Sequence, residues 1–292
     1  MDVSGSVGGA DVGVVGGIRR YPVKSMLGEE LEAADLDTAG LVGDRGHALV
    51  DVETGKVVSV KRPRRWGRMF ELAAITSSEG VTVVMPDGAR HAIDDPALPG
   101  ALAGVFGREV SIASEPPPDA SFDEAWVRDL KDGAEPYFGG ASRIEEGDEL
   151  VDAGGFMSAM GSFFNFGAVH LLTTGTLRRL AELAPESRFE PARFRPNIVV
   201  DTPDDGFVET SWQGRELSIG GVRLAVSFTV PRCVMTTLPQ DDLPADRGVL
   251  QAVTRHNAVD TFGTGVAYPC VGVYADVVEA GRISVGDRVT LR

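Results

Sequence analysis

The sequence predicts a mostly β protein with a few helices, of the α+β class, in two successive β-rich parts. Apolar and polar residues alternate in many short stretches, most clearly from Val222 to Val230, which is the period of a half-buried strand. Turns rich in glycine, proline and aspartate separate the stretches, about every 8–12 residues in the first part of the chain. A helical period is clear at Leu177, Leu180 and Ala184. Short strands with tight turns indicate antiparallel sheets.

Composition excludes several classes of protein. The 292 residues are 43% hydrophobic and 24% charged, as in ordinary soluble globular proteins. The formal net charge of −15 argues against nucleic acid or an anionic membrane as a partner. No apolar run approaches the ~20 residues of a membrane-spanning helix, and the N-terminus lacks a signal peptide's basic flank, so we expect a cytoplasmic protein. The two cysteines exclude a disulfide framework and any four-cysteine metal site.

The N-terminal part begins with a strand that leads into a basic turn. Residues 1–11 are expected to form a flexible tail, and residues 12–115 a β domain. The strand-like run from Val12 to Arg20 is followed by Lys24 and Ser25. An ammonium group beside a hydroxyl suits a phosphate, and the other interpretation is a solvated surface turn.

A second basic cluster lies at residues 61–68, where five of eight residues are basic. Pro63 and Gly67 interrupt it, and the chain as a whole is acidic. The cluster is therefore expected to be a pocket for a small anion or a solvated loop, rather than a nucleic-acid patch.

Residues 116–166 are expected to be a connector, because the strand pattern is lost and proline, glycine and acidic residues dominate. One short helix is predicted within it, around residues 122–130. Its aromatic-rich end, Phe156 to Phe166, is expected to pack onto the body of the protein or to cover a site as a lid. Residues 167–292 then form the second β domain.

The second domain offers two groups of polar residues. Thr173 and Thr176 flank the start of the predicted helix, where hydroxyls and free N–H groups favour an anion, or serve as an ordinary helix cap. Arg195 and Asn197 lie two residues apart at the start of a strand, so their side chains are expected to point to the same side. His170, alone in an apolar run, is expected to be a core histidine.

Cys233 is the residue with the clearest chemical potential. Pro231 ends the strand that starts at Val222 and is expected to lift Arg232 and Cys233 out of the sheet. A nearby guanidinium favours the thiolate, the form that attacks electrophiles and binds metals. The alternative is that Cys233 is a small buried hydrophobic residue, which is also the interpretation we give to Cys270.

The motifs together resemble the MOSC family, in its two-part form with an N-terminal MOSC-associated β-barrel domain. The resemblance spans residues of about 18 to 290, and it rests on Tyr21-Pro22-Val23-Lys24-Ser25, Gly43-Asp44-Arg45, Phe194-Arg195-Pro196-Asn197, Arg232-Cys233 with Thr236-Thr237, Gly272-Val273-Tyr274 and Val285-Gly286-Asp287. The fold it implies is an N-terminal β-barrel-like domain followed by a MOSC β-barrel domain.

Within this family the resemblance is to the mitochondrial amidoxime-reducing components and their bacterial counterparts. It implies a molybdenum cofactor (Mo-molybdopterin), with Cys233 as the catalytic residue and metal ligand. The cofactor-binding residues it implies are Lys24, Ser25, Arg45, Thr173, Thr176, Arg195, Asn197 and Arg232. Two positions depart from the family pattern: Pro231 replaces a small polar residue and His47 an aromatic one.

Three functions follow from the resemblance. The first is reduction of N-hydroxylated small molecules, with electrons from a separate ferredoxin, flavoprotein or cytochrome. The second is a sulfur carrier that holds a persulfide on Cys233. The third is a binding protein that stores or delivers the cofactor without turnover. The set of phosphate-binding residues favours the first and third, because a persulfide carrier does not need it.

Overall fold

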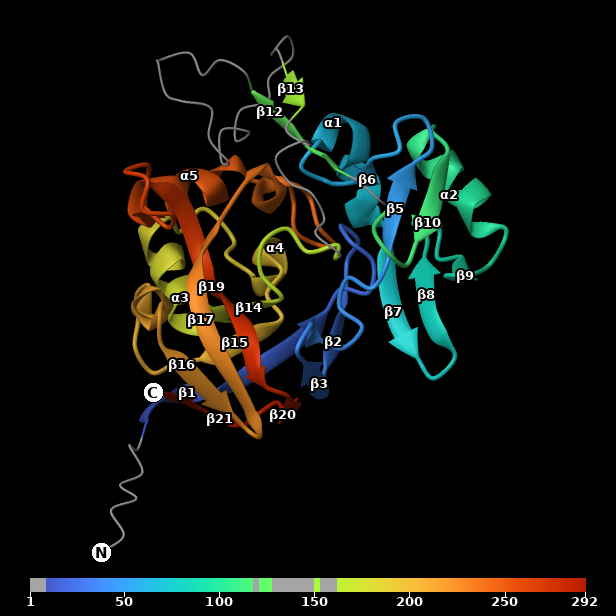
Figure 1. Ribbon diagram of the computed structural model, residues 1–292. Helices are drawn as coiled ribbons and strands as arrows, with labels where there is room; N and C mark the ends of the chain where they lie inside the picture. The colour runs from blue at the N-terminus through green and yellow to red at the C-terminus, as the bar shows by residue number, and fades with distance from the viewer. Residues whose placement is uncertain (1–8, 118–120, 128–149, 153–161) are drawn as a thin grey trace, which may run out of the picture.

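The structure is a computed structural model that describes residues 9–117, 121–127, 150–152 and 162–292. These residues form two neighbouring β-rich lobes, a barrel and a set of smaller sheets (Figure 1). The predicted fold class is confirmed. None of the helices in these ranges has the length and apolar character needed to span a membrane.

Seven strands of the described chain close into a barrel. In order around it they are β14 (Val169–Thr173), β15 (Ile198–Asp201), β1 (Ala10–Arg20), β21 (Arg288–Leu291), β16 (Glu216–Ile219), β17 (Val222–Pro231) and β19 (Tyr268–Glu279). Strand β19 pairs with β14 and so closes the barrel. Strands β14 and β15 run parallel to each other, and the other neighbouring strands of the barrel are antiparallel. Two short strands extend the sheet: β2 (Glu29–Leu31) pairs with β1, and β18 (Ala258–Val259) with β19.

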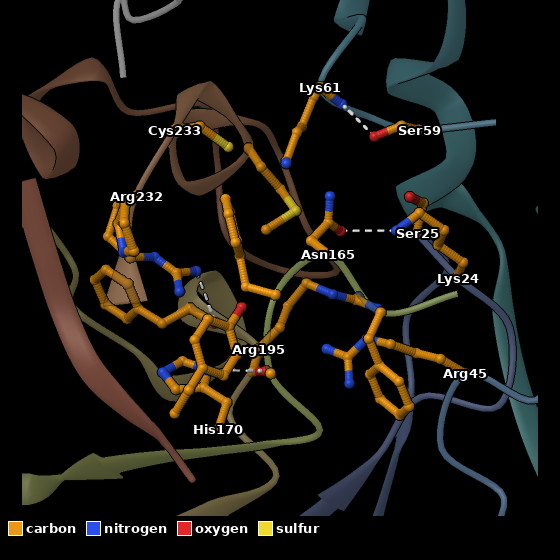
Figure 2. A pocket seen from close by; sticks show the side chains of 17 residues that line it. Lys24, Ser25, Arg45, Ser59, Lys61, Asn165, His170, Arg195, Arg232 and Cys233 are labelled. Carbon is orange, nitrogen blue, oxygen red and sulfur yellow. Dashed lines mark hydrogen bonds between the residues drawn. The ribbon is translucent and has the colours of Figure 1, made fainter. Parts of the chain in front are cut away.

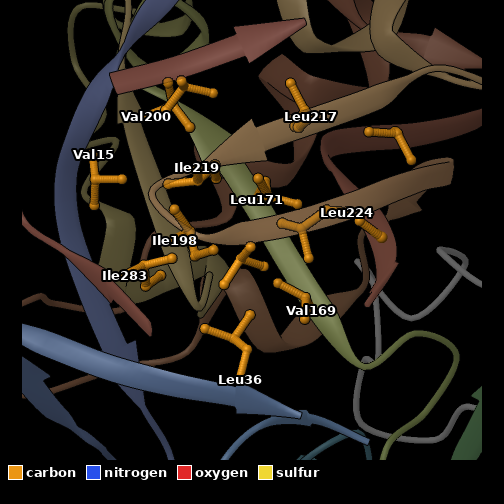
Figure 3. Packing of buried hydrophobic residues seen from close by; sticks show 14 of the residues in the cluster. Val15, Leu36, Val169, Leu171, Ile198, Val200, Leu217, Ile219, Leu224 and Ile283 are labelled. Atoms are coloured by element: carbon orange, nitrogen blue, oxygen red, sulfur yellow. The ribbon is translucent and has the colours of Figure 1, made fainter. Parts of the chain in front are cut away.

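Apolar side chains fill the interior of the barrel (Figure 3). Leu171, Ile198, Leu217 and Leu224 come from four different strands and are fully buried. Because successive side chains of a strand point to opposite faces, the alternating pattern places one set inside and leaves the other for solvent or the helices. The barrel is therefore a packed core, and a ligand site is expected at its end or edge.

The first strand belongs to this barrel, although it comes from the N-terminal part of the sequence. Strand β1 pairs with β15 and β21, and Ala10 and Asp11, which the sequence assigned to the tail, pair with Leu291 and Thr290. Both partner strands lie far from β1 in the sequence, so local composition carries no signal for this pairing. The domain boundaries themselves remain a prediction.

Helices cover the outside of the barrel. They are α3 (Thr174–Leu183), α4 (Pro191–Phe194) and α5 (Arg247–His256), with 3₁₀ turns η4 (Val208–Trp212) and η5 (Val234–Thr237). Thr173 caps α3, since its Oγ1 accepts from the N–H of Thr176 at 3.1 Å. The predicted helix is thus present, and its threonine-rich start acts as a helix cap.

The other lobe consists of small sheets. One contains β10 (Val110–Ala113), β5 (Ala48–Asp51), β6 (Val57–Val58) and β11 (Phe122–Asp123), and a second contains β7 (Ala73–Ser77), β8 (Gly80–Val84) and β9 (Arg90–Ala92). A third sheet, of β3 (Ala33–Asp37), β4 (Gly40–Leu41) and β20 (Gly281–Ser284), packs against the barrel, because Leu36, Leu41 and Ile283 belong to the barrel core. A fourth sheet joins β12 (Ala125–Val127) to β13 (Leu150–Asp152). The core of the smaller-sheet lobe lies around Trp66. Three helical segments pack on it: α1 (Pro63–Trp66), the 3₁₀ turn η1 (Gly67–Glu71) and α2 (Leu98–Phe106). The predicted helix around residues 122–130 is wrong, because β11 and β12 occupy its described part.

The basic cluster at residues 61–68 is largely neutralised within the protein. Arg62 and Arg65 donate to the fully buried Asp123 at 2.6 and 2.9 Å, and the indole of Trp66 donates to the same carboxylate at 2.7 Å. Burial alone raises the pKa of Asp123, but the bonds from Trp66 and Arg62 outweigh it and lower the pKa below the ordinary value of 3.8. This carboxylate therefore connects β11 to α1.

Asp123→Asn is expected to destabilise the protein by about 3 kcal/mol at neutral pH, because it leaves two arginines beside a buried neutral amide. The contribution of Asp123 is present above pH 3.8 and is lost as pH falls through the lowered pKa of the folded state. Urea unfolding at neutral and at acidic pH measures both effects. Glu71→Gln, which breaks the exposed pair with Arg68, is the control and is expected to cost less than about 1 kcal/mol. Equal effects of the two substitutions would contradict the prediction.

Candidate functional site

A pocket lies between the two lobes (Figure 2). The smaller-sheet lobe contributes Lys24, Ser25, Arg45, Ser59 and Lys61. The barrel side contributes His170, Phe194, Arg195, Pro231, Arg232, Cys233, Met235 and Tyr274, and the segment before β14 contributes Phe164, Asn165, Phe166 and Gly167. Six of the residues selected from the sequence line this pocket: Lys24, Ser25, Arg45, Arg195, Arg232 and Cys233.

Strand β17 delivers the thiol to the pocket. The strand ends at Pro231, as predicted, and Cys233 precedes the 3₁₀ turn η5. The backbone N–H of Arg232 donates to Pro269 O at 2.7 Å, which fixes the chain at this point. Cys233 is partly exposed, whereas Cys270 is fully buried in β19 and burial raises the pKa of its thiol to about 11. Cys233 is therefore the reactive candidate, and Cys270 has the buried environment expected of a structural residue.

The pocket has a strongly cationic lining. Five lysine and arginine side chains line it, and none of its described lining residues is acidic. Two carboxylates lie behind this lining, Asp44 beside Arg45 and Glu124 beside Lys61. Such an excess of positive charge in a partly enclosed site is suited to binding an anion.

Backbone strain is concentrated in the same residues. Among the described non-glycine residues, four have positive φ, and three of them line the pocket: Ser25 at 67°, Arg45 at 50° and Arg195 at 54°. This conformation is unfavourable for residues that carry a Cβ, and it persists where the surrounding structure holds it in place. The strain coincides with the predicted phosphate-binding residues and supports a ligand-binding role for them.

Two guanidinium nitrogens in the pocket are buried without a hydrogen-bond partner among the described residues: Arg195 Nη2 and Arg232 Nε. The rest of the structure holds Arg195 in place, since Nη1 donates to Met26 O at 2.5 Å and the guanidinium stacks 4.0 Å from the ring centre of Tyr21. Burial lowers the pKa of Arg195 to about 10 and lowers that of Arg232 as well. A bound anion would supply the missing acceptor and oppose this effect of burial.

Lys24 is held by the segment that precedes β14. Its Nζ donates to Phe163 O at 2.9 Å and to Asn165 Oδ1 at 2.7 Å (Figure 2). Burial lowers the pKa of Lys24 well below its ordinary value. Phe164 and Asn165 form part of the pocket wall, and the pocket encloses about 80 Å³, so this segment limits the space for a ligand. The predicted lid at Phe156 to Phe166 lies partly outside the described residues.

Three residues selected from the sequence do not line the pocket. The hydroxyls of Thr173 and Thr176 both donate to the buried carboxylate of Glu209, at 2.7 Å in each case. Asn197 Oδ1 accepts from the N–H of His170 at 3.1 Å, and its amide donates to Arg19 O at 3.3 Å. Their polar groups therefore stabilise the barrel. The hydrogen-bond partners lie far away in the sequence, so only the tertiary structure reveals this role.

His170 is buried as predicted, yet its ring also reaches the pocket. Nδ1 lies 3.3 Å from Arg195 O and Nε2 lies 3.3 Å from Val271 O. Burial and the charge of Arg232 lower the pKa of His170 well below the ordinary value, so its imidazole is neutral at physiological pH. The ring packs closely over Gly272, where a Cβ would lie 2.3 Å from His170 Nε2 and 2.5 Å from Leu171 O.

Gly272→Ala is expected to destabilise the protein by at least about 3 kcal/mol. The residue has φ of +83°, so an alanine adds backbone strain to a direct clash with His170. Gly265→Ala is the matched control, because that residue has φ of +82° and open space around it, and strain alone costs about 1 kcal/mol. Chemical unfolding of both variants measures the difference, and similar values for the two would contradict this explanation.

The sequence did not single out several pocket residues as ligand contacts. Lys61 appeared only as part of a basic cluster, Asn165 only as part of the predicted lid, and nothing local marked Ser59 or Met235. Ser59 and Lys61 directly follow strand β6. They reach the pocket because the smaller-sheet lobe packs against the barrel, which the local sequence does not show. The basic cluster and the aromatic-rich stretch were the available signals.

Comparison with known proteins identifies two family matches. Residues 12–98 match the MOSC N-terminal beta barrel domain, and residues 161–290 match the MOSC domain. The chain is 26% identical to mitochondrial amidoxime reducing component 2 of Bos taurus over 95% of this chain and 83% of that protein. It is 35% identical to the Homo sapiens protein of the same name over 36% of this chain and 31% of that protein. The solved structure of the YUAD protein from Bacillus subtilis aligns with 96% of this chain and 95% of its own, with a TM-score of 0.44 and 14% identity.

Proposed function

This chain belongs to the MOSC family, and on that premise we propose that it is a molybdenum-cofactor-dependent oxidoreductase that reduces N-hydroxylated small molecules. The observation that carries the proposal is a partly exposed thiol in a pocket with five lysine and arginine side chains and no acidic residue in its described lining. Two similar proteins are named mitochondrial amidoxime reducing component 2, and an amidoxime contains an N–O bond of this kind.

The residues present fit such a cofactor. The unpartnered Arg195 Nη2 and Arg232 Nε offer hydrogen bonds to an anion, as a pterin phosphate requires. A thiolate is a soft ligand suited to binding a transition metal. We assign Cys233 as the metal ligand, and Lys24, Ser25, Arg45, Arg195 and Arg232 as the residues that hold the pterin and its phosphate. Thr173, Thr176 and Asn197 are not part of this set, because their polar groups are bonded within the barrel.

When bound, the molybdenum cofactor supplies the two-electron redox chemistry. The overall reaction converts an N–OH group, two electrons and two protons into N–H and water. The protein's own contribution is to hold the anion with Arg195 and Lys24, to keep the thiol at the pocket, and to exclude bulk water with the segment around Asn165. We assign the electrons to a separate ferredoxin, flavoprotein or cytochrome, since two cysteines cannot hold a four-cysteine cluster.

Two measurements on the full chain, produced in a host that makes the cofactor, test this function. Elemental analysis is expected to find close to one molybdenum per chain, and the purified protein is expected to reduce benzamidoxime with a supplied electron donor. Protein without molybdenum but with labile sulfane sulfur on Cys233 would instead support the sulfur carrier. Protein with molybdenum that reduces no N-hydroxylated compound would support storage or delivery of the cofactor.

A further inference from the structure

Lys61 enters the pocket from the smaller-sheet lobe. It follows β6 and precedes α1, and its side chain reaches the cavity on the side where Cys233 lies (Figure 2). Arg45 occupies the opposite side of this view. The sequence assigned no specific role to Lys61, and the phosphate-binding set proposed above does not include it.

A buried carboxylate fixes the position of Lys61. Its Nζ lies 3.1 and 3.2 Å from the two oxygens of Glu124, whose side chain is 0% exposed. Glu124 also accepts from Ser59 Oγ at 3.3 Å and from Asn165 Nδ2 at 2.9 Å. An ammonium group has three donors, so Lys61 can bond to Glu124 and still direct an N–H into the pocket. Because Glu124 already holds the Lys61 side chain in place, little side-chain entropy is lost when a ligand binds to it.

Lys61 is the pocket cation whose charge is influenced most by Glu124 and Cys233. Burial lowers the pKa of Lys61, but Glu124 and Cys233 raise it more, so that its pKa lies above the ordinary value and the group is charged at neutral pH. Cys233 also acts on Arg232. The charge of Arg45 is influenced mainly by Asp44, Tyr274 and Tyr21, and that of Arg195 by Tyr21, Arg45 and Asp44. Lys61 is thus held by Glu124 on the side of the pocket where Cys233 lies, and Arg45 lies on the opposite side.

We propose that Lys61 binds the oxygen atom of the substrate's N–O group and is a catalytic residue, held in position by Glu124. This inference rests on the proposed function and adds the group that recognises the substrate's oxygen. Reduction breaks the N–O bond with two electrons from the redox partner, and two protons complete the N–H group and the water. Negative charge develops on the departing oxygen before it is fully protonated, and a positioned ammonium in an enclosed site stabilises that charge.

Kinetics of loaded enzyme provide the first test. Lys61→Gln is expected to lower kcat for benzamidoxime about 100-fold with little change in KM, because the interaction strengthens in the transition state. Lys61→Arg is expected to recover most of this loss, since it restores the charge. Molybdenum content is expected to stay at the wild-type level in both variants. Arg68→Gln, an exposed residue of the same basic cluster that pairs with Glu71, is the control and is expected to keep full activity. A Lys61→Gln enzyme with unchanged kcat, or one that loses molybdenum, would overturn the proposal.

Binding without turnover separates this inference from the proposed function. Calorimetry at neutral pH is expected to show that the wild-type protein binds N-phenylhydroxylamine more tightly than aniline, which is also uncharged but lacks the oxygen, and that this preference disappears in Lys61→Gln. Wild-type protein that loads molybdenum but reduces nothing would contradict the proposed function, while the binding preference would still decide the role of Lys61. A preference that is absent in the wild type, or that persists in Lys61→Gln, would contradict the proposal for Lys61.

Discussion

Cys233→Ala is expected to give a folded protein that contains no molybdenum and has lost at least about 1,000-fold in benzamidoxime reduction, because it removes the proposed metal ligand and with it the proposed redox centre. The substitution lies at the end of β17 in a partly exposed position, so it is expected to cost little stability. Elemental analysis, activity and an unfolding curve on the same preparation measure the three effects.

Cys270→Ala is the matched control for this prediction. Cys270 is fully buried and does not line the pocket, so its replacement is expected to cost about 1 kcal/mol of stability while molybdenum and activity stay at the wild-type level. Full molybdenum content in Cys233→Ala, or its loss in Cys270→Ala, would show that Cys233 is not the metal ligand.

Arg195→Gln is expected to weaken cofactor retention about 10- to 100-fold, since a charge-assisted hydrogen bond to a phosphate contributes about 1.5–3 kcal/mol. Arg195 has a buried nitrogen without a partner among the described residues, in a backbone conformation that is itself unfavourable. Molybdenum remaining per folded protein, measured after extended dialysis, reports this effect.

Arg193 separates cofactor binding from the structural effect of losing a buried arginine. It lies two residues before Arg195 and is fully buried, but its guanidinium donates to backbone carbonyls, including Arg188 O at 3.0 Å and Pro244 O at 2.8 Å. Arg193→Gln is therefore expected to lower the free energy of unfolding without lowering molybdenum per folded protein. If Arg195→Gln retains molybdenum as well as the wild type, Arg195 does not hold the phosphate.

Some features of the site could be predicted from the sequence because they depend on neighbouring residues. Pro231 ends a strand wherever that strand lies in the fold, so the presentation of Cys233 beside Arg232 was predictable. Lys24 with Ser25 formed a local pair of groups suited to a phosphate. All of these residues line the pocket, and their roles toward a cofactor remain a prediction.

Other features depend on partners that the local sequence does not reveal. Thr173 and Thr176 looked like anion-binding residues, but the carboxylate of Glu209, more than thirty residues further along the chain, takes both hydroxyls. The basic cluster that contains Lys61 was expected to form a pocket for a small anion or a solvated loop, and only the structure places Glu124 beside Lys61. A polar residue can bind a ligand only with donors and acceptors that the fold leaves free, and sequence spacing does not show which remain free.

The sequence by itself determined the β-rich fold class, the end of the strand before Cys233, and most of the cations that surround the thiol. Those properties follow from side-chain alternation, from the missing N–H of proline, and from the fixed charges of lysine and arginine. Only the tertiary structure decided that β1 completes the barrel, that the pocket lies between the lobes, and which polar groups reach it. Strand pairing and lobe packing bring together residues that are far apart in the chain, and local sequence patterns do not determine which of these distant residues come into contact.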